Sequence, residues 1–379
     1  MASLVHGRAS WLDGLRGIGV LAVISWHVRD GEPFRALNGH NGVLVFFVVS
    51  GFLITGLALR EEDREGRVDL RAFWRRRAWR LLPLYYLALA VVTVVLLGMR
   101  LGDGQEAFRR ALPYYAGYVQ EWPALAQQTR APFALSWSLG IEEKFYVVWP
   151  LLAFLVLRRH RRWRVPLAAA LLLASLASQP LLTRAWSAVL LPYSHILLGC
   201  LVALLLHPRP AGVPRPAAWV PVTVTACLVL WFVPLEGAAQ VLFTIPVAGL
   251  VAGLATAPGC AVARALSWRP LAWVGVVSYG VYLFHTLALN VVDQLAPVDL
   301  PPVAVLLLGT ALVLVVARVL HVVVEAPLIR CGRRPRRAGR PGPGAVPPGR
   351  ADAAHGTAGA TAATGSSTAQ PPGVRTRDL

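Results

Sequence analysis

An arginine and a histidine lie in one apolar stretch near the N-terminus, WLDGLRGIGVLAVISWH, with ten residues between them. In an α-helix this spacing gives about three turns and a rise of about 16 Å, so Arg16 and His27 project from one face at two depths. A titratable or charged group inside a membrane span is costly and is a candidate for function. An imidazole suits proton transfer near neutral pH, whereas a guanidinium suits an anion. The alternative is that each residue marks one membrane interface.

Two more arginines, Arg77 and Arg80, stand one helical turn apart in the stretch FWRRRAWRLLP. Guanidinium groups bind phosphate in bidentate fashion, so this pair is a candidate site for a phosphorylated ligand. Arginines beside a membrane span also set its orientation or contact anionic lipid, which is the alternative for this pair.

Paired carboxylates open another apolar stretch, WSLGIEEKFYVVWP. Glu142 lies four residues after Ser138 and four before Tyr146, so a helix places the three on one face. Glu143 must then point about 100° away, where pairing with Lys144 or with lipid headgroups is expected. Glu142 is therefore the functional candidate. The alternative is structural, because acidic side chains favour helix N-termini.

Other polar residues in or beside apolar stretches are candidates to line a pore, with packing in the core as the alternative for each. Asp13 lies one turn before Arg16 and is its expected ion-pair partner. Ser50 stands beside Gly51, and two small residues also allow helices to approach closely. The four cysteines are isolated from one another, so no metal site is expected. The remaining candidates are His195, Tyr279, His285 and Glu325.

The composition predicts the elements that must carry these residues. Of the 379 residues, 56% are hydrophobic and 15% are charged, and the apolar residues gather in runs long enough to span a bilayer. The sequence therefore predicts an all-α, polytopic transmembrane helical bundle of about ten spans. The expected spans are residues 11–30, 41–59, 81–99, 137–157, 165–183, 187–206, 219–235, 239–257, 272–292 and 301–324.

The net charge of +18 is distributed as the positive-inside rule requires of a membrane protein. Eight arginines fall in residues 60–80 and five in residues 158–164, whereas the loops expected outside hold few. Both termini are therefore expected to be cytoplasmic. The connection over residues 100–135 is an exception with four arginines, but long loops cross the membrane largely regardless of charge. This placement argues against nucleic acid as a partner.

The chain is expected to divide into a transmembrane domain over residues 1–330 and a cytoplasmic tail over residues 331–379. From Gly339 onward the sequence is mainly Gly, Pro, Ala, Ser and Thr without hydrophobic periodicity, which predicts disorder. Any chemistry must then take place among the helices.

Six motifs, in order along the chain, resemble the acyltransferase-3 family of integral membrane acyltransferases, which O-acylate envelope polysaccharides, peptidoglycan and some secreted glycosides or macrolides. They are LDGLRGIGVLAVISWH, GVLVFFVVSGFLIT, FWRRRAWRLLP, WSLGIEEKFYVVWP, SYGVYLFH and VVVEAPL. Two features depart from the family pattern. Lys144 stands where the family usually has glutamine, and no extracellular esterase-like domain is expected after the tenth span.

The resemblance implies transfer of an acyl group, most often acetyl, from cytosolic acyl-CoA to a hydroxyl presented on the outer side. Arg16, Arg77 and Arg80 would bind acyl-CoA, with acetyl-CoA as the expected donor. His27 would take the proton of the acceptor hydroxyl as general base. Glu142 would orient either His27 or the acceptor. Whether His27 instead carries the acyl group covalently is left open by the residues.

The expected protein is a multi-pass enzyme of the cytoplasmic, or inner, cell membrane. Its expected partners are acyl-CoA, membrane lipid and a sugar-containing acceptor, which is a glycan, a lipid-linked saccharide or a glycosylated metabolite such as a macrolide. A secondary transporter also carries charges at mid-membrane, but it would be favoured by two similar halves, which the sequence does not show. A lipid-binding scaffold would explain the arginines but not the buried histidines.

Overall fold

The computed structural model describes residues 10–28, 32–100, 104–122, 131–207, 219–296 and 299–332. Every regular element in these ranges is helical, which confirms the predicted all-α class. The predicted tail lies outside the described residues, apart from Cys331 and Gly332, which still belong to the last helix.

Fourteen α-helices are described, and wider π-helical turns extend three of them. The π-helical turns are Val94–Gly98 after α4, Leu151–Val156 after α7 and His321–Glu325 after α14. The α-helices are α1 (Ser10–Trp26), α2 (Glu32–Arg35), α3 (His40–Glu65), α4 (Leu70–Thr93), α5 (Gln105–Ala116), α7 (Trp137–Pro150), α8 (Arg164–Ala177), α9 (Arg184–Leu206), α10 (Trp219–Trp231), α11 (Val241–Thr256), α12 (Ala261–Leu266), α13 (Arg269–Leu295), α14 (Pro302–Leu320) and α15 (Ala326–Gly332).

Each of the ten predicted spans contains a helix. Among the described residues, seven helical segments are long and apolar enough to cross a membrane, as expected of a multi-pass membrane protein. Two of the other three are short, since α1 has 17 residues and α10 has 13. The third, α7 with its π-helical turn, carries the adjacent charges Glu142, Glu143 and Lys144. The helix positions are thus confirmed, whereas ten spans and cytoplasmic termini stay predictions.

The arginine-rich segment over residues 60–80 is mostly helix rather than loop. Helix α3 continues to Glu65 and ends at Gly66, whose φ of 69° suits glycine. Helix α4 then begins after Asp69, whose carboxylate accepts the N–H of Ala72 at 3.0 Å. This bond lowers the pKa of the Asp69 carboxyl below its usual value. The arginines therefore sit on the rigid ends of two helices.

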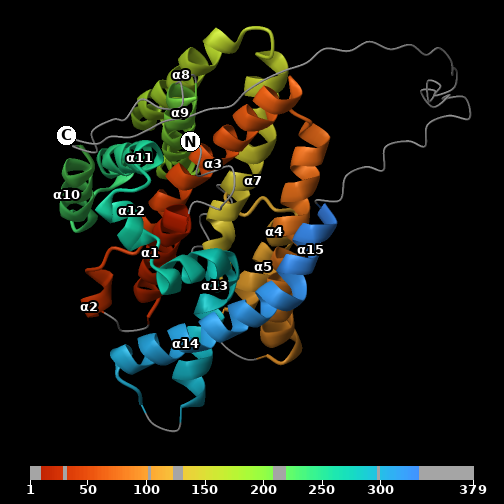
Figure 1. The fold of residues 1–379 in the computed structure, drawn as a ribbon. Coiled ribbons are helices and arrows are strands. Elements are labelled where there is room, and N and C mark those ends of the chain that lie inside the picture. The colour runs from red at the N-terminus through yellow and green to blue at the C-terminus, as the bar shows by residue number, and fades with distance from the viewer. Residues whose placement is uncertain are drawn as a thin grey trace, which may run out of the picture. The chain divides into compact units, whose positions relative to one another are not determined.

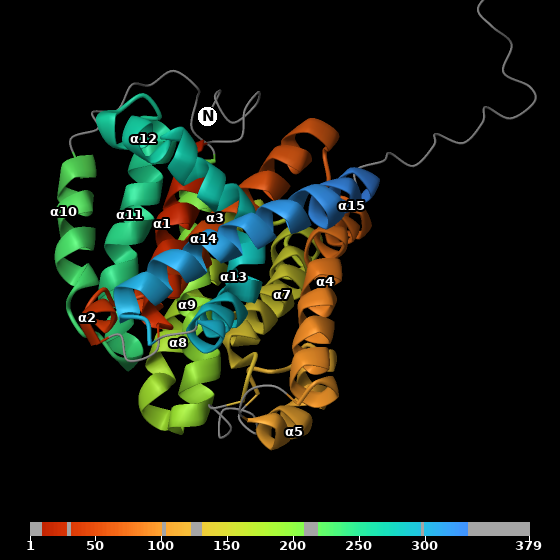
Figure 2. The same cartoon turned by 90° about the horizontal axis from the view of Figure 1, so that it is seen from below.

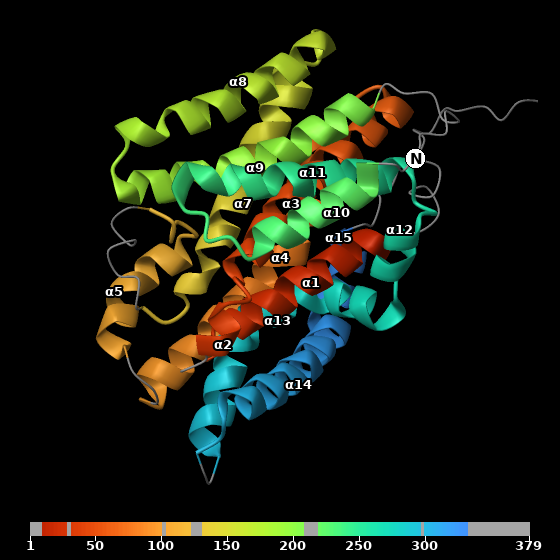
Figure 3. The ribbon, with the colours of Figure 1, turned by 90° about the vertical axis from the view of Figure 1, so that its left-hand side faces the viewer.

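A row of closely packed helices forms the centre of the bundle, in the order α14, α13, α1, α3, α9 and α8 (Figure 1, Figure 3). Glycines allow the closest approaches in this row. A Cβ on Gly275 of α13 would collide with the carbonyl oxygen of Asp13 on α1. A Cβ on Gly51 of α3 would collide with the carbonyl oxygen of Ile196 on α9, so Gly51 is indeed a packing residue.

Helices α4 and α7 pack beside this row, and side-chain hydrogen bonds join α4 both to α7 and to the row. Trp74 Nε1 on α4 donates to the carbonyl oxygen of Tyr146 on α7 at 3.0 Å. The hydroxyl of Tyr279 on α13 donates to the carbonyl oxygen of Leu81 on α4 at 2.8 Å. Figure 2 shows α14 crossing over α13, with α15 lying beside α4. Helices α1, α3, α4, α7 and α13 thereby come together around one space.

Candidate active site

A cavity of about 520 Å³ lies among α1, α3, α4, α7 and α13. Nine of the thirteen predicted site residues line it, and the other four, His27, His195, His285 and Glu325, do not. The polar and charged residues of its wall are Asp13, Arg16, Ser50, Arg60, Arg77, Arg80, Tyr118, Ser138, Glu142, Glu143, Tyr146, Ser278, Tyr279 and Tyr282.

Helix α1 supplies Arg16 and Asp13 to the wall. Nη1 of Arg16 lies 3.9 Å from Oδ1 of Asp13, as the one-turn spacing predicted. The Arg16 guanidinium also lies over the ring of Phe46 on α3, 5.9 Å from its centre. Contacts from two helices therefore position this guanidinium.

Helix α4 supplies the predicted pair Arg77 and Arg80. The Arg77 guanidinium lies over the ring of Tyr146 on α7, 4.6 Å from the ring centre, and over Phe73 at 5.9 Å. A cation over an aromatic face is attracted to it electrostatically, and a guanidinium carries a fork of N–H donors that suits planar recognition of phosphate. The two rings therefore restrain the cation that Arg77 contributes to the wall.

Helix α7 supplies Ser138, Glu142 and Tyr146 from one face, as their spacing predicted. The hydroxyl of Tyr146 donates to Oε2 of Glu142 at 2.6 Å, a charge-assisted bond that fixes the carboxylate. Glu143 also lines the cavity, so both glutamates belong to the wall. The expectation that Glu143 points away from the cavity is therefore wrong, whereas the role of Glu142 stays a prediction.

Lys144 has a different partner from the one expected. It pairs with Glu121 and donates to the carbonyl oxygen of Tyr118 at 2.7 Å, instead of pairing with Glu143. The cause is that the segment after α5 folds back onto the start of α7 and buries Glu121, whose side chain is 2% exposed. A buried carboxylate requires a cation, and Lys144 provides it.

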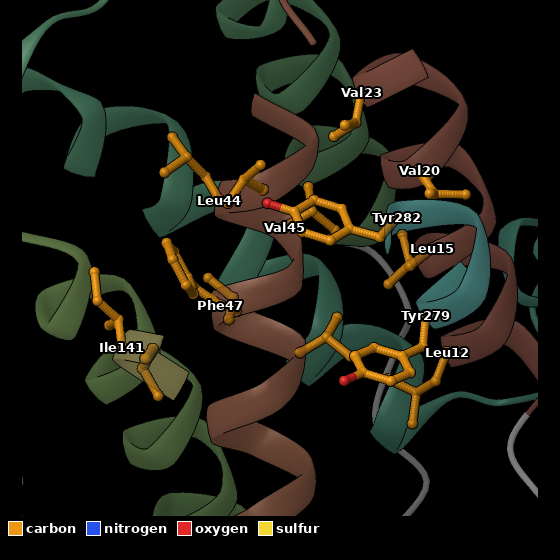
Figure 4. Packing of buried hydrophobic residues seen from close by; sticks show 14 of the residues in the cluster. Leu12, Leu15, Val20, Val23, Leu44, Val45, Phe47, Ile141, Tyr279 and Tyr282 are labelled. Carbon is orange, nitrogen blue, oxygen red and sulfur yellow. The ribbon is translucent and has the colours of Figure 1, made fainter. Parts of the chain in front are cut away.

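Helix α13 supplies Tyr279 and Tyr282, whose rings lie one turn apart with both hydroxyls directed to the same side (Figure 4). The Tyr282 hydroxyl donates its single hydrogen to the carbonyl oxygen of Leu135 at 2.7 Å. The contact of 2.8 Å between this hydroxyl and Oγ of Ser138 is then a bond that Ser138 donates. Tyr282 thereby ties α13 to the start of α7.

Arg60 was not among the predicted site residues, although a pattern on α3 leads to it. Apart from the adjacent pair Val49 and Ser50, the wall residues of α3 recur every three or four positions, which is the spacing of one helix face. They are Val43, Phe46, Val49, Ser50, Leu53, Leu57 and Arg60. Continuing the face that contains Ser50 beyond the apolar run would have included Arg60 among the binding candidates.

His27 lies outside this wall. It follows the last residue of α1, and its side chain is exposed. The buried ring of His285 on α13 packs edge-on against it, with the ring centres 4.8 Å apart. The ring of Tyr282, a wall residue, lies 5.9 Å from that of His285. The structure therefore brings two of the predicted histidines into contact. Tyr282, which packs against His285, is the residue that both lines the cavity and contacts this pair.

His195 and Glu325 lie elsewhere in the bundle. His195 is fully buried, and its Nδ1 lies 3.0 Å from Oγ1 of Thr244 on α11. Glu325 is buried and pairs with His321 one turn earlier, at 2.8 Å. Such contacts are typical of core residues. Among the described residues, no three His, Cys, Asp or Glu side chains gather as a metal site would require.

The family of the chain follows from comparison with known proteins. The acyltransferase domain of the acyltransferase-3 type matches residues 9–322. The chain belongs to the acyltransferase-3 family. All five helices around the cavity lie inside the matched acyltransferase-3 domain.

Two bacterial relatives align with most of this acyltransferase-3 chain. It is 30% identical over 319 residues to "Putative peptidoglycan O-acetyltransferase YrhL" of Bacillus subtilis, which covers 74% of this chain and 48% of that protein. It is 26% identical over 358 residues to "Peptidoglycan O-acetyltransferase OatA" of Listeria monocytogenes, which covers 85% of this chain and 56% of that protein. The chain thus spans about half the length of these relatives. No solved structure matches it.

Proposed function

We propose that this protein is a membrane O-acetyltransferase that takes an acetyl group from acetyl-CoA, bound in the cavity, and passes it to a hydroxyl of an envelope glycan. The observation that carries the proposal is the gathering of Arg16, Arg60, Arg77 and Arg80 on one wall. Coenzyme A carries several phosphate charges, and clustered guanidinium groups are well suited to bind them. Charged side chains inside a membrane-spanning bundle are costly and mark a candidate functional site.

The acyl end of the donor would extend from the arginines toward His27. The rise of α1 between Arg16 and His27 is about 16 Å, a distance suited to the extended pantetheine arm of coenzyme A. Tyr282 is the wall residue in ring contact with His285, so the arm would pass beside Tyr282.

His27 would act as the general base at the end of this path. It takes the proton of the acceptor hydroxyl while the hydroxyl oxygen bonds to the carbonyl carbon of the thioester. The carbon–sulfur bond then breaks, and His27 returns its proton to the departing sulfur. The products are an O-acetyl ester and the free thiol of coenzyme A.

Peptidoglycan is the first acceptor to test, because both relatives described above are named for O-acetylation of that polymer. A glycosylated secreted metabolite is the alternative acceptor. Mass spectrometry of cell-wall glycans and of secreted metabolites, from cells with and without this protein, distinguishes the two.

The donor is tested by replacing the arginine pair in membrane vesicles supplied with acetyl-CoA. Arg77→Ala with Arg80→Ala should raise the KM for acetyl-CoA about tenfold or more, because each charge-assisted hydrogen bond contributes about 1.5–3 kcal/mol. The KM for the acceptor should change much less.

A matched control removes two guanidinium groups at another place. Arg109 and Arg110 on α5 are exposed, so Arg109→Ala with Arg110→Ala should leave the KM for acetyl-CoA unchanged. If the Arg77 and Arg80 variant kept a normal dependence on acetyl-CoA, the pair would serve topology alone. If the unmodified protein transferred no acetyl group from acetyl-CoA, the proposed donor would be wrong.

A further inference from the structure

His27 and His285 form a pair whose proton positions follow from their other partners. Nδ1 of His285 lies 2.8 Å from the carbonyl oxygen of Tyr282. A carbonyl oxygen only accepts, so this nitrogen carries a hydrogen. Nδ1 of His27 lies 2.8 Å from the carbonyl oxygen of Val23 and carries a hydrogen for the same reason.

In the hydrogen bond between the two rings, the donor and the acceptor can then be assigned. His285 is fully buried, and burial opposes a charged ring, so its Nε2 holds a lone pair. That nitrogen lies 3.3 Å from Nδ1 of His27. The Nδ1–H group of His27 is therefore shared between the Val23 carbonyl and His285. The lone pair of neutral His27 remains on Nε2, at the end of an exposed side chain.

We propose that His285 is a positioning residue, which acts together with the Val23 carbonyl to hold His27 in the tautomer and orientation that present the Nε2 lone pair to the acceptor hydroxyl. The inference rests on the function proposed above. Nε2 of His27 takes the hydroxyl proton and later gives it to the departing sulfur. Throughout, the Nδ1–H group stays bonded to Nε2 of His285, so a neutral ring stabilises the transient imidazolium.

The packing of the fold supports a fixed geometry for this pair. The rings meet edge to face at 71°, and His285 sits in the middle of α13, the helix that packs against α1. The ring of His285 is anchored at Nδ1 to the backbone of its own helix, which prevents it from turning away. The position of the His27 ring is therefore set by the contact between α1 and α13.

Two substitutions at one position separate the hydrogen bond from the packing. His285→Leu removes the acceptor and should lower kcat about 10- to 100-fold, as is typical for partners that orient a functional imidazole. The KM values for acetyl-CoA and acceptor should not change, because His285 touches neither. His285→Gln supplies an amide oxygen that accepts from Nδ1 of His27, so its kcat should stay within about threefold of the unmodified enzyme.

The control for losing a buried imidazole is His195→Leu. His195 is also fully buried and bonded to a neighbouring helix, and it lies outside the cavity wall. Its replacement should leave kcat unchanged. A normal kcat in His285→Leu, or equal losses in His285→Leu and His285→Gln, would overturn the role of His285 as acceptor.

A second measurement needs no acetyl transfer. Nitrogen-15 NMR of histidine-labelled protein distinguishes the two tautomers, and the signals of His27 are those missing in His27→Gln. We expect neutral His27 to be protonated at Nδ1 in the unmodified protein and in both variants, because the Val23 carbonyl accepts from this nitrogen in each. The Nδ1 signal should move in His285→Leu, where the second acceptor is lost, and stay near its original position in His285→Gln. Protonation of neutral His27 at Nε2 in the unmodified protein would overturn the proposal, even in a protein that fails to transfer acetyl groups.

Discussion

At the scale of single residues, charged side chains that line the cavity are in contact with other side chains that restrain them. Asp13 accompanies Arg16, Tyr146 lies under Arg77, and the Tyr146 hydroxyl also binds Glu142. One aromatic residue thus positions both a cation and a carboxylate. The wall is therefore arranged before any ligand enters it, and this lowers the cost of ordering side chains when an anion binds.

Replacing His27, the proposed general base, should reduce acetyl transfer more than any other substitution considered. His27→Ala should reduce acetyl transfer about 10²- to 10⁴-fold, the usual contribution of a general base. Membrane insertion should be normal, because His27 is exposed and follows the last residue of α1, so the apolar residues of that helix are unchanged. Transfer to glycan and the amount of protein in the membrane fraction are the two measurements. The control is Trp26→Ala, at a neighbouring position that is also exposed, and this variant should keep its activity. If His27→Ala still transferred acetyl groups at the normal rate, His27 would not be the base.

At the scale of elements, α1 is positioned by close contact with α13 along a glycine-lined seam. Gly17 of α1 approaches the carbonyl oxygen of Leu271 on α13, and Gly275 of α13 approaches that of Asp13 on α1. Gly14 of α1 approaches the carbonyl oxygen of Leu266 at the end of α12, just before α13 begins. Helix α1 carries Arg16 to the cavity, and α13 carries His285 to His27. The seam therefore sets the positions of the arginine and of the histidine pair at once.

Gly275→Ala should destabilise the protein. Alanine favours a helix over glycine by about 1 kcal/mol, but overpacking costs about 1–3 kcal/mol and more where the neighbour is backbone that has no other rotamer. The added Cβ meets the Asp13 carbonyl, so the clash should prevail. Thermal unfolding in detergent measures the effect.

Gly259→Ala is the control for this substitution, since nothing lies within 4 Å of the Cβ it adds. It should leave the unfolding temperature nearly unchanged. An unfolding temperature for Gly275→Ala equal to or above that of the unmodified protein would mean that α1 and α13 are further apart than described.

At the scale of the whole molecule, the proposed reaction requires two opposite faces. The arginines at the ends of α3 and α4 would meet the donor on the cytoplasmic side, whereas His27 would meet the acceptor outside. Helix α5, which follows α4, would then lie on the outer side of the membrane. The turn before α8 would lie on the cytoplasmic side. This orientation follows from the arginine distribution and stays a prediction.

Cysteine labelling in a background without the native cysteines tests the orientation. A cysteine replacing Arg109 on α5 should react with an impermeant maleimide in intact cells, because the side chain is 67% exposed on the outer side expected for it. A cysteine replacing Arg161, 55% exposed before α8, should react only after the cells are opened. The reverse pattern would invert the proposed path from donor to acceptor.

The sequence by itself determined where the helices form, because a long apolar run in a bilayer must satisfy its own backbone hydrogen bonds. The spacing of Ser138, Glu142 and Tyr146 placed them on one face, and the structure puts that face in the cavity wall. The ordered motifs indicated the acyltransferase-3 family, which the family match confirms.

Only the tertiary structure decided which of these faces meet. The sequence allowed Lys144 to pair with the adjacent Glu143. In the folded protein the segment after α5 places Glu121 beside Lys144, and these two residues pair instead. His27 and His285 are 258 positions apart, and no local pattern relates them. Helical periodicity is a property of neighbours along the chain, whereas the partner of a face depends on how separate helices pack. That packing brings His285 to His27 and leaves both histidines just beyond the wall that the arginines line.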